Sequence, residues 1–307
     1  ETGRALRSAS RLITVNRDAR EELSERLRID PGRIEVVMPL AARVPHEPPA
    51  GAQLEAVRRK YMLPAEFILM LGTVEERHNH KVLFEAVGSL GERERAIRAE
   101  GLGAAQREAV AADPELPGLA AGRARGGGAA TGMRGETPAD AAVPPAASSA
   151  ERVGIVVCGR RTVYADSLLE YARGRHMASR VDFIYELSPD DLPALFRLAH
   201  AFVYLPDAGI EASIVPVVEA MRAGVPMVLS DTQLNREAAG DAAAYVRPEA
   251  AGEVAAALEN VLSDVNFRRE MKARERRRAE LFSEYAVARR LIDFLSGVAY
   301  AGEGKIK

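Results

Sequence analysis

Short apolar runs alternate with helical patterns along most of the chain. The runs Phe67–Leu71, Val153–Cys158 and Phe202–Leu205 consist almost wholly of apolar residues, which is typical of parallel strands that are covered on both faces. Between such runs, apolar residues recur at helical spacing, as they do from His80 to Leu90. Strict alternation of strand and helix predicts an α/β fold with a Rossmann-like, doubly wound parallel sheet.

The remaining elements are predicted by the same patterns. Further strands are expected at residues 11–15, 34–38, 181–185 and 227–229, and further helices at 17–29, 54–61, 165–173, 189–199, 216–223, 254–262, 267–285 and 286–298. Asn16 is expected to cap the helix that follows it, because asparagine is favoured at that position.

Composition sets two segments apart from the rest of the chain. Residues 39–50 contain four prolines and are typical of a linker, whereas residues 92–150 are rich in Gly, Ala, Pro and Arg. The second segment has too few large apolar residues to offset the entropy of ordering it, so it is predicted to be a disordered insertion.

Net charge and cysteine content limit the partners and the cellular compartment that are expected for this chain. A net charge of −2 and a pI near 6.3 argue against a nucleic-acid partner. Cys158 is the only cysteine, which excludes an internal disulfide and fits a reducing compartment. No apolar run approaches the roughly 20 residues of a spanning helix, so a cytoplasmic protein is predicted. The scattered histidines predict no metal site, and no G-x-G-x-x-G follows a strand, which argues against a dehydrogenase.

The stretch from Ala201 to Asp231 predicts strand, loop, helix and strand. Pro216 is suited to the first turn of that helix, and Gly224 to its end. Glu211 and Glu219 stand eight positions apart around the helix start. If the helix begins near Pro216, Glu219 lies in its first turn, beside free N–H groups of residues 214–218.

A helix start of this kind attracts a diphosphate. Ionised carboxylates only accept hydrogen bonds, so the two glutamates suit the hydroxyls of sugars on either side of the diphosphate. The pattern therefore predicts a nucleotide-sugar site. The alternative is a pair of solvated glutamates near an ordinary helix start.

The same stretch resembles a known family. The spacing Glu-x7-Glu, whose second glutamate lies within Pro-Val-Val-Glu-Ala-Met-x-Ala-Gly-Val-Pro-Met-Val over residues 216–228, is similar to the donor-binding signature of the retaining glycosyltransferases of family four, the group 1 proteins with the GT-B fold. The resemblance implies transfer of a sugar from a nucleoside-diphosphate sugar to an acceptor with retention. The donor is a substrate, and no cofactor is implied. Glu211 is then the catalytic residue.

A second match follows the strand Phe67–Leu71. In the family, a glycine and a short basic loop here reach the donor phosphates, often through Arg-Lys-Asn; this chain has Arg77, His78 and Asn79. Asn79 also fits as the N-cap of the next helix, and an ordinary polar loop is the alternative. The donor-binding residues that the resemblance implies are Gly72, Thr73, Arg77, His78, Leu187, Ser213, Ile214, Val215 and Glu219.

The chain departs from the family in the loop before residue 216, where Gly-Phe-Gly-Leu is usual and Ala212-Ser213-Ile214-Val215 stands. Ile214 resists the positive φ that glycine permits, although the Ser213 hydroxyl can donate to a phosphate or sugar oxygen. An alternative function is therefore a catalytically inactive nucleotide-sugar-binding subunit.

The resemblance also assigns the domains. Residues 1–44 are expected to close an N-terminal Rossmann domain and begin the linker, residues 45–299 to form the C-terminal donor domain, and residues 300–307 to be a tail. Most of the acceptor-binding domain is thus expected to be absent, as in a fragment or truncated product. The acceptor that the resemblance implies is a glycan or a lipid-linked molecule.

Residues 267–290 contain nine Arg or Lys against four Glu. Such a helix suits peripheral contact with an anionic membrane or simply a solvated face. The sequence leaves the oligomeric state open.

Overall fold

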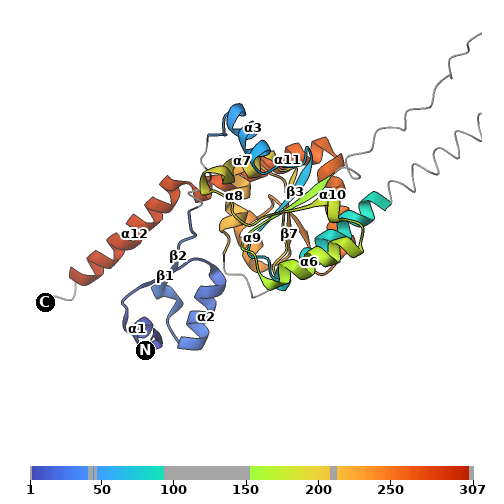
Figure 1. Ribbon diagram of the computed structural model, residues 1–307. Helices are drawn as coiled ribbons and strands as arrows, with labels where there is room; N and C mark the ends of the chain where they lie inside the picture. The colour runs from blue at the N-terminus through green and yellow to red at the C-terminus, as the bar shows by residue number, and fades with distance from the viewer. Residues whose placement is uncertain (1, 41–43, 45–46, 93–152, 208–212, 304–307) are drawn as a thin grey trace, which may run out of the picture.

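The computed structural model describes residues 2–40, 44, 47–92, 153–207 and 213–303. The predicted insertion over 92–150 lies outside these ranges except for Glu92, which is helical, and the predicted catalytic Glu211 lies outside them too. The described residues form a six-stranded sheet and a two-stranded sheet, and every strand pair is parallel (Figure 1).

The large sheet has the strand order of a Rossmann fold. Its strands are β3 (Phe67–Leu71), β4 (Gly154–Cys158), β5 (Val181–Ile184), β6 (Ala201–Tyr204), β7 (Met227–Ser230) and β8 (Ala244–Val246). They lie in the order β5-β4-β3-β6-β7-β8, so the direction of winding reverses between β3 and β6. The short edge strand β8 was not among the predicted strands.

Helices cover both faces of this sheet, as the doubly wound prediction requires. They are α3 (Gly51–Lys60), a stretch over 80–92, α6 (Val163–Gly174), α7 (Leu192–Leu198), α8 (Val215–Ala223), α9 (Gln233–Ala239), α10 (Ala251–Ser263) and α11 (Val265–Ala279). Short 3₁₀ turns occur at Pro31–Arg33, Glu76–His78, Ala178–Arg180, Pro189–Asp191 and Glu280–Phe282.

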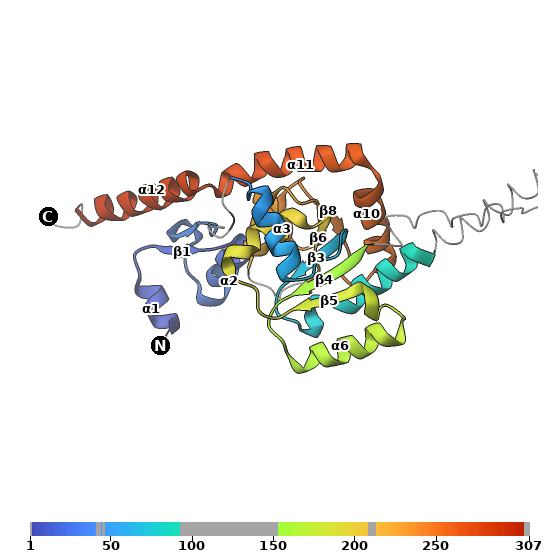
Figure 2. The same cartoon turned by 45° about the horizontal axis from the view of Figure 1, so that its top comes forward.

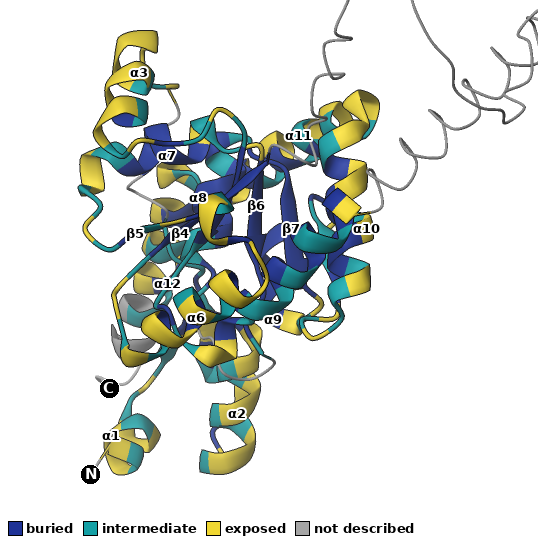
Figure 3. Ribbon diagram, turned by 45° about the vertical axis from the view of Figure 1, so that its right-hand side comes forward, coloured by how far each residue is buried: buried dark blue, intermediate teal, exposed yellow. Residues whose placement is uncertain are grey.

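Alternate side chains of each central strand enter different cores. Phe67 and Leu69 pack with residues of α7 and α8, whereas Ile68 and Met70 pack with residues of α6 and α10. All four are buried, and the strands form the dark blue centre of Figure 3. A strand buried on both faces needs apolar residues at every position, which explains the continuous apolar runs.

The N-terminal residues form a small unit of their own, with α1 (Thr2–Ser8), β1 (Leu12–Thr14), α2 (Arg17–Leu27) and β2 (Ile34–Val36). Asn16 accepts a hydrogen bond from Ala19 N at 2.7 Å, which confirms the predicted cap. The last helix, α12 (Glu284–Glu303), extends beside this unit (Figure 2). There the Arg11 guanidinium lies 4.8 Å from the centre of the Phe294 ring. None of the helices in the described part of the chain combines the length and apolar character needed to cross a membrane.

Candidate functional site

The loops that follow β3 and β6 meet at the point where the strand order reverses. In open α/β sheets, ligands bind in the crevice outside the carboxyl ends of the strands at this point. The Asn79 side chain donates hydrogen bonds to Leu205 O at 3.0 Å and to the Asp207 carboxylate at 2.6 Å. Asp207 N donates to Arg77 O at 3.0 Å. These bonds hold the two loops together at the point where the strand order reverses.

Asn79 therefore does not act as predicted. Its carbonyl lies at the start of the helix over 80–92 and accepts from Leu83 N at 3.4 Å, but its side chain reaches the β6 loop instead of capping the helix. Its φ of 55° explains the difference, because an N-cap side chain reaches the first turn from extended backbone. Asp207 was missed; its only signal was a polar residue just after a buried strand.

Glycines allow the loops after β3 and β4 to touch. Gly72 has a φ of 147°, which glycine adopts without steric cost, and its N donates to Cys158 O at 3.0 Å. A Cβ on Gly159 would lie 1.6 Å from Gly72 O. The backbone at the predicted donor residue Gly72 is thus positioned by direct contact with a second loop.

The next residues of the β3 loop are more enclosed than a polar loop would be. His78 is only 5% exposed, and its Nδ1 lies 2.6 Å from Thr73 O. A carbonyl only accepts, so Nδ1 carries the proton of this bond. The Arg77 guanidinium is partly exposed and pairs with Glu75 at 2.6 Å.

His80 lies directly behind His78. The two rings meet edge to face with centres 6.1 Å apart. His80 is 1% exposed, and its Nδ1 has no hydrogen-bond partner. Burial, and after it the charge of His78, lowers the pKa of His80 to about 4. His80 is therefore neutral at physiological pH and contributes no positive charge to an anion site.

The second part of the candidate site is the start of α8, the helix that follows β6. Pro216 stands in the first turn, and Gly224 caps the far end, as predicted. Ile214 has φ −88° and ψ −3° and is 2% exposed among the core residues. The loop therefore takes a right-handed conformation that a β-branched residue accepts, with its side chain turned into the core.

Some of the N–H groups that were predicted to be free have partners. Val215 N donates to the Ser213 hydroxyl at 3.3 Å, and Val218 N donates to Ile214 O at 3.0 Å. Proline at 216 has no N–H. The amides of Ile214 and Val217 remain as candidate donors, and Ser213 keeps its hydroxyl proton for a ligand.

Glu219 lies one residue further into the helix than predicted. The helix begins at Val215, so its first turn contains no acidic residue. Glu219 is fully buried and takes part in an interaction within the protein, as a buried carboxylate must. Glu219 is thus placed in the buried part of α8, whereas Glu211 belongs to the residues that the structure does not describe.

Leu187 follows β5, which is separated from β3 by β4. Two strand spacings place it roughly 10 Å from the β3 loop, at the periphery of the crevice. It is half-buried against the α7 and α8 side of the core, and Ser188 N beside it donates to the Tyr61 hydroxyl at 3.1 Å. The topology thus puts the predicted residues of the β3 loop and the start of α8 at the same edge of the sheet, with Leu187 two strands away from β3.

Known proteins resemble this chain in sequence and in fold. The pattern of the family described as Glycosyl transferases group 1 matches residues 142–278. The O-antigen chain mannosyltransferase RfbU of Salmonella typhimurium is 34% identical over 108 residues, which are 35% of this chain and 30% of that protein. The O-antigen chain mannosyltransferase B of Escherichia coli is 28% identical over 132 residues, 43% of this chain and 34% of that one.

Solved structures extend the likeness to nearly the whole chain. A glycosyltransferase from Rickettsia africae superposes with a TM-score of 0.68 at 13% identity, covering 97% of this chain and 66% of that one. Anabaena HepE, solved in complex with UDP and glucose, gives 0.67 at 12% identity, with 96% and 66% covered. The matched lengths are about a third of the curated relatives and two thirds of these structures. The region over 142–278 thus belongs to the group 1 glycosyltransferase family, and the sheet around it has the Rossmann strand order.

Proposed function

We propose that this chain supplies the donor-binding domain of a retaining glycosyltransferase that transfers mannose from a nucleoside-diphosphate sugar. One observation carries the proposal: the β3 loop and the start of α8, which contain all but one of the implied donor residues, lie together where the strand order reverses. The choice of mannose is supported by the names of the two curated relatives.

In this proposal, the diphosphate lies between the start of α8 and the β3 loop. The amides of Ile214 and Val217 and the Arg77 guanidinium stabilise the negative charge that develops on the leaving group. Glu219 accepts from a hydroxyl of the nucleoside ribose or the sugar, and Glu211 acts at the reacting sugar.

The small unit of β1, α2 and β2 is assigned to the acceptor side. Its parallel βαβ arrangement and its contact with α12 through Arg11 and Phe294 support a place at the end of an N-terminal Rossmann domain, with residues 45–299 as the donor domain. The relatives' names support a glycan acceptor on a lipid carrier or on the growing O-antigen chain.

A second function is favoured by two particular residues. The Ile214 side chain is turned into the core where the family has a flexible glycine loop, and the His78 Nδ1 is engaged by Thr73 O. A domain that binds the nucleotide sugar without transferring it, as a regulatory subunit, is consistent with both features.

Calorimetric titration with UDP, GDP and ADP tests the donor site. We expect one of them to bind, and Glu219→Gln to weaken it by roughly tenfold or more, as loss of a hydrogen bond to a charged group does. The matched control is Glu170→Gln on the exposed side of α6, which should bind like the parent. If none of the three nucleotides binds, both functions are excluded.

Sugar transfer then separates the two functions. The chain is assayed together with an acceptor domain and radiolabelled nucleotide sugars. Transfer of mannose supports the enzyme, and nucleotide binding without any transfer supports the regulatory subunit.

A further inference from the structure

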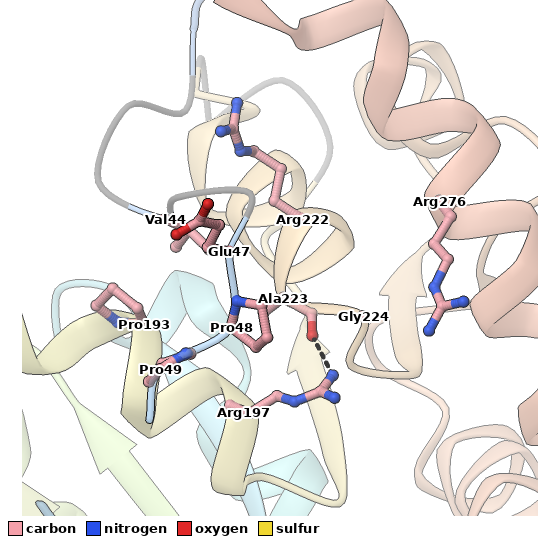
Figure 4. A pocket seen from close by; sticks show the side chains of 10 residues that line it. All are labelled: Val44, Glu47, Pro48, Pro49, Pro193, Arg197, Arg222, Ala223, Gly224 and Arg276. Atoms are coloured by element: carbon pink, nitrogen blue, oxygen red, sulfur yellow. Dashed lines mark hydrogen bonds between the residues drawn. The ribbon is translucent and has the colours of Figure 1, made fainter. Parts of the chain in front are cut away.

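A second hollow lies at the opposite end of α8 from the candidate donor site. This cavity of about 270 Å³ opens beside Gly224, and Figure 4 shows the side chains that line it. Three of them are arginines from three helices: Arg197 of α7, Arg222 of α8 and Arg276 of α11. We name this set, with its cavity, the arginine cavity.

The arginine cavity has little compensating charge. Arg197 donates one hydrogen bond, to Ala223 O at 3.1 Å, which anchors the guanidinium and leaves most of its N–H groups available. The Nε of Arg222 is buried and has no hydrogen-bond partner. Within the described residues, no ion pair joins any of the three arginines to a carboxylate, and Glu47 is the only acidic residue of the lining.

The positive surface continues along α11. Next to the arginine cavity is another hollow, of about 350 Å³, which is lined by the same Arg276 and by Arg268, Arg269 and Lys272. Burial, together with the neighbouring charges of Arg197, Arg268 and Arg276, lowers the pKa of Lys272. Glu275, which follows on the same helix, is fully buried, and burial raises its pKa well above the ordinary value.

This concentration of cations does not follow from composition, because the chain as a whole carries a net charge of −2. It is also separate from the proposed donor site. The nine residues of α8 span roughly 14 Å, so an anion in the arginine cavity lies about that far from the start of the helix.

We propose that the arginine cavity is a second anion site, which binds a molecule bearing phosphate groups. Guanidinium groups match phosphate oxygens with paired N–H groups. The cavity is larger than a single ion requires and shares Arg276 with the hollow of α11, which suits a diphosphate or the phosphate of a larger molecule. The phosphate comes from a free metabolite or from a lipid headgroup.

Calorimetric titration with inorganic pyrophosphate tests the proposal on the full chain. We expect the double variant R222Q/R276Q to lose roughly tenfold or more in pyrophosphate affinity, while nucleotide binding at the donor site is unchanged. The control is Arg173→Gln, an exposed arginine of α6, which removes one positive charge elsewhere and should bind like the parent. Thermal melts establish that each variant is folded, and the exposed Arg276→Gln alone serves if the double variant is not.

Vesicles identify the source of the phosphate. Co-sedimentation compares phosphatidylcholine vesicles with and without phosphatidylglycerol. Binding only to the anionic vesicles, lost in R222Q/R276Q and retained in Arg173→Gln, supports a lipid headgroup, whereas loss of pyrophosphate binding alone supports a free metabolite. The proposal is overturned if the parent binds neither probe, or if the double variant binds both as the parent does.

Discussion

Replacing Gly159 by alanine tests the contact that shapes the floor of the crevice. The added Cβ would lie 1.6 Å from Gly72 O, 2.6 Å from Gly72 C and 3.4 Å from Thr73 N. Optimal contacts between carbon atoms are about 3.5 to 4.0 Å, so the β3 loop must move back by roughly 2 Å. The movement strains the bonds from Gly72 N to Cys158 O and from Val74 N to Arg160 O.

These effects set the expected magnitude. Overpacking costs about 1 to 3 kcal/mol, and each lost hydrogen bond about 1 kcal/mol more. For a chain of this size each kcal/mol lowers the melting temperature by about 2 to 4 °C, which gives a fall of roughly 5 to 15 °C. Nucleotide affinity should fall as well, because Gly72 and Thr73 are displaced.

Gly174→Ala is the matched control. No atom lies within 4 Å of the Cβ it would add at the end of α6, and alanine stabilises a helix by roughly 0.5 to 1 kcal/mol over glycine. The measurements are circular-dichroism melts, urea unfolding and nucleotide titration of both variants. If Gly159→Ala melts and binds like Gly174→Ala, the two loops do not approach each other as described and the reasoning fails.

Three further predictions concern single side chains. Burial lowers the pKa of His80 to about 4, so between pH 6.5 and 4 the unfolded chain binds a proton that the folded chain does not. The free energy of unfolding should therefore fall by up to roughly 3 kcal/mol as the pH falls through that window. In urea unfolding, the free energy of unfolding of His80→Gln should depend less on pH than that of the parent, whereas the exposed control His176→Asn should behave like the parent. Equal pH dependence in all three proteins would contradict the assignment. Burial raises the pKa of Cys158 to about 12, so this single thiol should not react with a disulfide reagent at neutral pH until guanidinium unfolds the chain; rapid labelling of the folded protein would count against its burial. Asn79→Gly keeps the positive φ but removes the bonds to the β6 loop, and should cost about 1 to 3 kcal/mol of stability and weaken nucleotide binding, whereas a variant with parental melting and affinity would show that these bonds do not position the site.

The sequence by itself determined the succession of elements. The run Phe67–Leu71 matches β3 residue for residue, Asn16 caps α2, and Pro216 and Gly224 lie at the two ends of α8. Such features depend on neighbours along the chain: burial on both faces of a strand requires consecutive apolar residues, and caps satisfy groups a few positions away. The signature over 216–228 also indicated the family from the residues alone.

Tertiary structure decided which distant groups meet. Asn79 has the composition of a helix cap, yet its side chain bonds Leu205 and Asp207, more than a hundred positions later in the chain. Ile214 has its side chain in the core because α8 packs there, and Glu219 is buried by the same packing. The arginine cavity joins side chains from α7, α8 and α11, none of which marks a site in its own segment. Local patterns record backbone hydrogen bonding and burial, whereas partners brought together by chain topology leave no periodic signal in the sequence.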